Sequence, residues 1–147
     1  MRLLFDASSL LNIIRYAGTE TLSILRGGFV LSLTLYEIGN ALWKEAALLN
    51  RISIEEAIFT LRQVKNLISR FMSIIEPVDT DLVLRLAHQL KITYYDASYV
   101  ASGYELDAVL VTDDYELKRR IEQNIDKLME ILRKKIMLVS SNEIMKK

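Results

Sequence analysis

The sequence contains no cysteine, one histidine and one proline in 147 residues. Without a thiol there is no disulfide framework, no thiolate zinc site and no cysteine nucleophile. With His88 as the only imidazole, histidine-rich metal sites and most Ser-His-Asp schemes would depend on a single residue. Any catalysis must therefore come mainly from carboxylates, hydroxyls and basic side chains.

Long hydrophobic runs are also missing, although 51% of the residues are hydrophobic. Charged residues interrupt the apolar stretches well short of the roughly 20 residues that span a bilayer. Asp6 stands where the apolar region of a signal peptide would continue. We therefore expect a cytoplasmic protein with one domain over residues 1–147, which is long enough to bury a core of its own.

The net charge is zero, because 19 basic residues balance 19 acidic ones. The distribution is uneven, since residues 1–114 carry a net charge of −4 and residues 115–147 carry +4. This asymmetry suggests an acidic site beside a basic surface. The seven tyrosines are dispersed along the chain and form no stacked-aromatic motif for RNA binding.

Short apolar segments alternate with helical patterns along the chain. The predicted strands cover residues 3–5, 29–31, 74–75, 108–111 and 136–139. Helices are predicted after Ser8 and over about 19–26, 34–50, 54–71, 79–91 and 95–106. This alternation indicates an α/β sandwich with parallel strands, in which ligands gather at the carboxyl ends of the strands.

Acidic residues stand at those ends and at the starts of helices. Asp6 ends the first strand, Asp113 and Asp114 follow the strand at 108–111, and Glu37 and Asp96 lie in first helical turns. Carboxylates gathered from separate segments repel one another unless a cation lies among them. Mg²⁺ and Mn²⁺ prefer such oxygen ligands and can activate a bound water for attack on a phosphodiester.

Most of these acids also have a structural explanation. Glu37 has capping-box spacing from Thr34, and Asp96 suits the first turn of a helix. Asp113 suits a helix N-cap. Asp6 is the hardest to explain structurally, because it places a charge directly after an apolar strand.

Four segments of the chain resemble the signature segments of PIN-domain ribonucleases, in the family's order and approximate spacing. They are Leu3-Leu-Phe-Asp-Ala-Ser-Ser-Leu-Leu-Asn12, Tyr36-Glu-Ile-Gly-Asn-Ala-Leu-Trp-Lys44, Tyr95-Asp-Ala-Ser-Tyr-Val-Ala101 and Leu110-Val-Thr-Asp-Asp-Tyr-Glu-Leu117. The likeness spans essentially the whole chain. In particular, the sequence is similar to VapC-type toxins of toxin–antitoxin pairs.

This resemblance implies a three-layer α/β/α sandwich around a central, mainly parallel sheet of four or five strands. It also implies a metal site of four acids supported by two hydroxyls: Asp6, Glu37, Asp96 and Asp114, with Ser8 and Thr112. Asp113 falls on the variable position beside them, as a candidate auxiliary ligand. The segment 119–136 is longer than in compact members of the family, and it could shift the basic surface or add a dimer contact.

The activity that the resemblance implies is that of an endoribonuclease dependent on Mg²⁺ or Mn²⁺, leaving 5′-phosphate and 3′-hydroxyl ends. The expected partners are an RNA substrate, a second copy of the chain, and a small VapB-type antitoxin in the groove beside the helical hairpin at 34–72. Four basic residues are candidates for contact with the RNA backbone, although solvation or ion pairing would also explain them: Lys44, Lys118, Arg119 and Arg120.

Two other classes of protein remain open. A receiver-type phosphoacceptor also gathers aspartates at strand ends, but its acid pair follows the first strand, whereas here the pair follows residues 108–111. A PIN-like interaction module without catalysis would not need the complete set of four acids. The RNA target is not readable from the sequence.

Overall fold

Five short parallel strands form one sheet in the order β3-β2-β1-β4-β5. The structure is a computed structural model and describes residues 1–146. The strands are β1 (Leu3–Phe5), β2 (Phe29–Leu31), β3 (Ser73–Ile75), β4 (Val109–Val111) and β5 (Leu138–Val139). This confirms the predicted parallel α/β sandwich.

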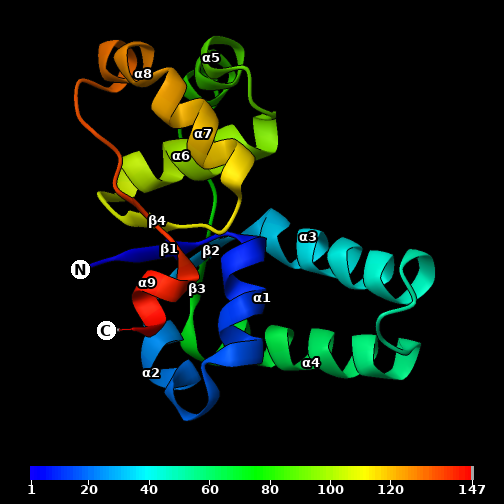
Figure 1. The fold of residues 1–147 in the computed structure, drawn as a ribbon. Helices are drawn as coiled ribbons and strands as arrows, with labels where there is room; N and C mark the ends of the chain where they lie inside the picture. The colour runs from blue at the N-terminus through cyan, green and yellow to red at the C-terminus, as the bar shows by residue number, and fades with distance from the viewer. Residues whose placement is uncertain (147) are drawn as a thin grey trace.

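Helices connect the strands and cover both faces of the sheet (Figure 1). They are α1 (Ala7–Tyr16), the 3₁₀ turn η1 (Gly18–Glu20), α2 (Thr21–Leu25), α3 (Ser32–Trp43), the π-helical turn η2 (Lys44–Leu48), α4 (Ile54–Phe71), α5 (Thr80–Leu90), α6 (Tyr94–Leu106), α7 (Tyr115–Gln123), α8 (Ile125–Leu132) and α9 (Ser141–Met145). Within residues 1–146 no helix combines the length and apolar character needed to cross a membrane.

The core has two halves because successive strand residues point to opposite faces of the sheet. Leu4 and Leu110 pack with helices α5 to α8 on one face. Phe5 and Val111 pack with α1 to α4 and α9 on the other face. Figure 1 shows the α5–α8 group on one side of the strands, and α3 and α4 projecting as an antiparallel pair. Both faces are therefore covered, as short apolar parallel strands require.

Several predicted boundaries were wrong. The helix expected over 34–50 begins at Ser32 and gives way to the π-helical turn η2 after Trp43. The helix expected over 19–26 is a 3₁₀ turn followed by the short α2, and the last strand covers only Leu138–Val139. The amphipathic segment from 119 lies mostly in α7 and α8, whose apolar faces are buried in the core.

Of the five glycines, Gly28, just before β2, has the least room for a side chain. A Cβ atom there would lie 2.7 Å from Cε2 of Phe5 and 3.0 Å from the carbonyl oxygen of Leu25. We expect Gly28→Ala to lower the free energy of unfolding by about 1–3 kcal/mol, because the buried ring must move. Gly39→Ala is the matched control, since a Cβ at this α3 position meets nothing within 4 Å.

The control substitution should stabilise the protein by up to about 1 kcal/mol, because alanine favours helix more than glycine does. Urea denaturation of both variants and the parent would measure the two effects. Equal stability of the two variants would contradict the close packing at Gly28.

Candidate active site

Asp6 is buried at the carboxyl end of β1, with only 6% of its surface exposed. As the N-cap of α1 it accepts hydrogen bonds from the Ser9 backbone N–H at 2.9 Å and the Ser8 hydroxyl at 2.8 Å. The Thr112 hydroxyl donates to its other carboxylate oxygen. Burial raises the pKa of Asp6, while the hydrogen bonds from Thr112, Ser9 and Ser8 lower it.

Asp114 is joined to Asp6 through Thr112. The Thr112 hydroxyl donates to Asp6 and accepts from the Asp114 backbone N–H at 3.1 Å. The Asp114 side chain caps α7 by accepting from two backbone N–H groups, at 3.0 and 3.1 Å. The N-cap of this helix is thus Asp114, which corrects the expectation that Asp113 would suit that position.

Glu37 points to a buried tyrosine and not to the start of its own helix. Because α3 begins at Ser32, Thr34 accepts the hydrogen bond from the Leu31 N–H, at 3.1 Å, and the expected Thr34–Glu37 capping box does not form. The Tyr99 hydroxyl instead donates to Glu37 at 2.7 Å. Burial raises the pKa of Glu37, the bond from Tyr99 lowers it, and the charges of the other three acids raise it.

Asp96 lies in the first turn of α6, where its backbone N–H donates to the capping Thr93 hydroxyl at 3.0 Å. Burial, together with the charges of Asp114 and Asp6, raises the pKa of Asp96 to about 6. The structure therefore brings the predicted four acids near enough to repel one another, although they come from four separate segments.

The chemistry of this donor set fits a hard divalent cation. Within residues 1–146 none of the four carboxylates forms a salt bridge with a basic side chain, so their repulsion is not relieved by the protein. As placed, however, no three acidic or histidine side chains of the described chain converge closely enough to hold one metal ion directly. Mg²⁺ commonly keeps several of its waters and takes only one or two carboxylates, so this set can still hold it partly through water.

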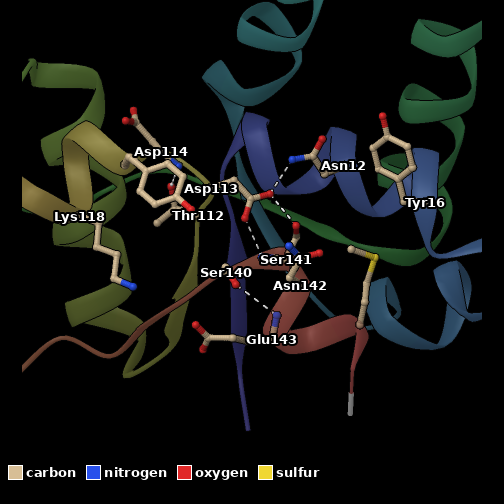
Figure 2. Close-up of a pocket in the computed structure, with 12 residues that line it drawn as sticks. Asn12, Tyr16, Thr112, Asp113, Asp114, Lys118, Ser140, Ser141, Asn142 and Glu143 are labelled. Carbon is tan, nitrogen blue, oxygen red and sulfur yellow. Dashed lines mark hydrogen bonds between the residues drawn. The ribbon is translucent and has the colours of Figure 1, made fainter.

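Asp113 has a different environment from its neighbour. One carboxylate oxygen accepts from the Asn12 amide at 2.7 Å and the Ser141 hydroxyl at 2.6 Å, and the other accepts from the Ser141 N–H at 2.8 Å (Figure 2). Its backbone N–H donates to Ser8 at 3.1 Å. Asp113 thereby ties α1 and α9 to the end of β4, and both of its oxygens are occupied by protein donors.

The four basic candidates divide into two groups. Arg119 and Arg120 both bind the Glu116 carboxylate, at 2.6 and 3.1 Å, on the exposed side of α7. Lys44 and Lys118 are exposed, and neither forms a salt bridge within the part of the chain that the structure describes. Ion pairing was one of the explanations open for these residues, and it applies to the two arginines.

Sequence reasoning missed Tyr99, because a tyrosine in a helical pattern carries no signal that it will reach Glu37. Its side chain is 1% exposed, and its hydroxyl also lies 2.7 Å from the Thr34 hydroxyl. Burial, followed by the charge of Glu37, raises the pKa of Tyr99, so it stays protonated and able to donate.

A buried Asp at the end of β1, joined by a hydroxyl to an Asp after β4 and surrounded by two further acids, is the arrangement expected of an acidic nuclease site in a parallel α/β fold. No protein-family model matches the chain. Exonuclease VapC9 from Pyrobaculum aerophilum is 42% identical over 97 residues, which cover 66% of this chain and 69% of the relative. The crystal structure of PAE2754 from the same organism has a TM-score of 0.68 and 32% identity, covering 90% of this chain and 96% of that one.

The chain therefore belongs to the VapC-like family of PIN-domain nucleases. The fold inferred from the four sequence segments is confirmed, and so is a nuclease function. The comparisons do not favour a receiver-type phosphoacceptor.

Proposed function

We propose that the chain is a metal-dependent endoribonuclease in which Asp6, Glu37, Asp96 and Asp114 hold Mg²⁺ or Mn²⁺. The observation that carries the proposal is the gathering of these four acids, none paired with a base in residues 1–146, at the ends of β1 and β4. When bound, the metal would supply an activated water and neutralise charge on the phosphodiester. Ser8 and Thr112 keep Asp6 in place, and we infer no metal-binding role for Asp113 because both of its oxygens are occupied.

Cleavage within a strand is proposed although the Pyrobaculum relative is named an exonuclease. The support is that Glu37 lines one cavity and Asp114 lines another. Because the two cavities contain different acids of the site, we infer that an RNA strand continues from the acids into both. An enzyme restricted to chain ends would instead be expected to close one side of its site.

Circular RNA tests the proposed function directly. We expect the purified protein with MgCl₂ or MnCl₂ to open a single-stranded RNA circle and to leave 5′-phosphate and 3′-hydroxyl ends, because a circle has no end to attack. EDTA should stop the reaction. Degradation of linear RNA alone would show an exonuclease.

The inactive-module alternative has its own measurement. Calorimetric titration with Mn²⁺ should give binding at millimolar concentration or tighter. Absence of both metal binding and cleavage would favour a PIN-like interaction module without catalysis.

A small VapB-type antitoxin is the proposed protein partner. The support is an apolar cavity of about 480 Å³ between α3 and α4, lined in part by Trp43, Ile54 and Ile58, which are 52%, 58% and 43% exposed. A segment in this groove could continue toward Glu37 and block the acidic site. Co-expression with the product of an adjacent small gene should give a stable, inactive complex, and free purification at full toxicity with no such gene would contradict it.

Two further proposals concern the assembly. We expect residues 1–147 to fold as one domain and to form a homodimer, since Phe59 of α4 is 63% exposed and does not line the groove proposed for the antitoxin. Light scattering on the purified chain would give the mass, and a monomer at micromolar concentration would contradict the dimer.

A further inference from the structure

Four of the seven tyrosines line cavities that also contain one of the four acids. Tyr16, Tyr36, Tyr95 and Tyr115 are the four most exposed of the seven, at 71%, 83%, 61% and 88%. Three of them are immediate sequence neighbours of an acid: Tyr36 of Glu37, Tyr95 of Asp96, and Tyr115 of Asp114. Large aromatic side chains are usually buried in the core, whereas these rings are exposed next to the acids.

The four tyrosines are divided between two cavities. Each cavity is also lined by one of the four acids. The first cavity, about 480 Å³, is lined by Asp114, Tyr16 and Lys118, which Figure 2 labels, and also by Tyr115. The second, about 860 Å³, contains Glu37 with Tyr36 and Tyr95. Both volumes are within the range of small-ligand pockets.

The second cavity also carries unpaired positive charge. Lys44 and Arg51 line it, and neither forms a salt bridge within residues 1–146. Its other acid, Glu45, forms two hydrogen bonds of 2.6 and 2.9 Å with Arg15, and this ion pair, followed by the charge of Arg51, lowers the pKa of Glu45. The backbone N–H of Arg51 donates to the carbonyl oxygen of Glu45 at 2.9 Å. This hydrogen bond holds the segment 44–51, which carries both Lys44 and Arg51.

The first cavity has a different balance. Lys118 and Glu143 both line it, and Asp113 is already bonded to Asn12 and Ser141. A phosphate would gain little from this mixture of charges. An aromatic base could instead stack on Tyr16 or Tyr115 and hydrogen-bond to neighbouring polar groups.

We propose that these cavities are base-stacking subsites for unpaired nucleotides on either side of the phosphodiester held at the acids, which rests on the proposed ribonuclease function. The ligand is single-stranded RNA, because only unpaired bases present a face to a tyrosine ring. Lys44 and Arg51 contact the backbone phosphate of the nucleotide next to Glu37, where the acids alone would repel it. Because stacking tolerates any base, these subsites favour unpaired structure over sequence.

Binding of fluorescein-labelled RNA to the full chain carrying Asp96→Asn, which should not cleave it, tests the subsites. We expect Tyr95→Ala to weaken binding of a 12-nucleotide single strand about tenfold, within the range measured for loss of one base stack. Tyr95→Phe should bind like the parent, because the ring is retained. Tyr94→Ala is the matched control, since Tyr94 is the preceding residue, is 42% exposed and lines neither cavity.

Tyr36→Ala and Tyr115→Ala should behave like Tyr95→Ala, and a duplex of the same sequence should bind more weakly than the single strand. Unchanged binding in the three alanine variants would overturn the proposal. An equal loss in Tyr94→Ala, or a loss in Tyr95→Phe as large as in Tyr95→Ala, would also overturn it.

A second measurement separates these subsites from the catalytic proposal. With Asp96 intact, Tyr95→Ala should lower kcat/KM about tenfold on the oligoribonucleotide and leave the affinity for Mn²⁺ in calorimetry unchanged, since all four acids are retained. Tyrosine-dependent binding without any cleavage would refute the ribonuclease function but not the RNA subsites. Cleavage that is unaffected by substitution of all three tyrosines would refute the subsites alone. If the three tyrosines are needed to bind the antitoxin but not to bind RNA, they form a protein interface instead.

Discussion

Replacing Asp96 by asparagine is expected to abolish RNA cleavage while making the metal-free protein more stable. Asp96 belongs to the proposed metal site, and a site with one negative charge fewer would hold the metal and its activated water less well. The Asp96 carboxylate contributes little to the fold, because the hydrogen bond to the capping Thr93 hydroxyl comes from the Asp96 backbone N–H. Asparagine has nearly the same shape and removes only the charge.

The gain in stability follows from the raised pKa. Burial and the charges of Asp114 and Asp6 raise the pKa of Asp96 to about 6 in the folded chain, against 3.8 as its ordinary value. A carboxyl group whose pKa is higher when folded favours folding most below pH 4, and this contribution is lost as the pH rises to 6. Above pH 6 the charged group opposes folding.

The effect on stability should be modest, because Asp96 is only partly buried and its charge also favours the N-terminus of α6. We expect about 1 kcal/mol after allowing for solvent screening, or a rise in Tm of about 3 °C at pH 7.5 in EDTA. The difference between the variant and the parent should shrink from pH 6 to pH 4. Saturating Mn²⁺ should raise the Tm of the parent more than that of the variant.

Asp81→Asn is the matched control, because Asp81 is an exposed first-turn acid of α5 outside the site. It should leave cleavage unchanged and lower stability by about 0.3–1 kcal/mol, since the favourable charge at a helix start is lost. Scanning calorimetry in EDTA and a fluorogenic RNA assay would measure both effects. Full activity of Asp96→Asn, or equal stability changes in the two variants, would contradict the account.

The sequence was sufficient for the class of fold, because that depends on local signals, whereas the set of four acids came from the resemblance to PIN-domain ribonucleases. Short apolar runs ending in Asp6 or Thr112 predict buried parallel strands, and the ends of parallel strands lie at one edge of the sheet. Asp6 was also the acid least explained by local structure, and it is buried with three donors around its carboxylate.

The roles of neighbouring polar residues could not be predicted, because they depend on tertiary contacts. Asp113 and Asp114 have the same chemistry, and only the position of α9 decides that Asp113 binds Ser141 while Asp114 caps α7. The beginning of α3 was misplaced because Leu31 ends a strand and also caps the helix, leaving no loop to mark the boundary. That Tyr16 of α1 and Tyr115 of α7 line one cavity likewise appears only in the folded chain.

Tyr99→Phe is expected to weaken Mn²⁺ binding and RNA cleavage about 10- to 100-fold, the usual cost of losing a residue that orients a metal ligand. The Leu31 N–H donates to the Thr34 hydroxyl, so that Thr34 can donate to Tyr99 and Tyr99 to Glu37. Each hydroxyl in this series of hydrogen bonds thus donates in one defined direction. The series places a buried donor against Glu37 and restricts the rotation of the Glu37 carboxylate.

Tyr99 is therefore a positioning residue, and a purely structural role predicts a different result. Tyr104→Phe is the matched control on α6, since the Tyr104 ring contacts Lys134 and its hydroxyl forms no hydrogen bond in residues 1–146. Both variants can be compared by Mn²⁺ calorimetry and urea denaturation. Tyr99→Phe should lose about 1–2 kcal/mol of stability together with metal affinity, whereas a loss of stability with full Mn²⁺ affinity would show that Tyr99 supports the core without orienting Glu37.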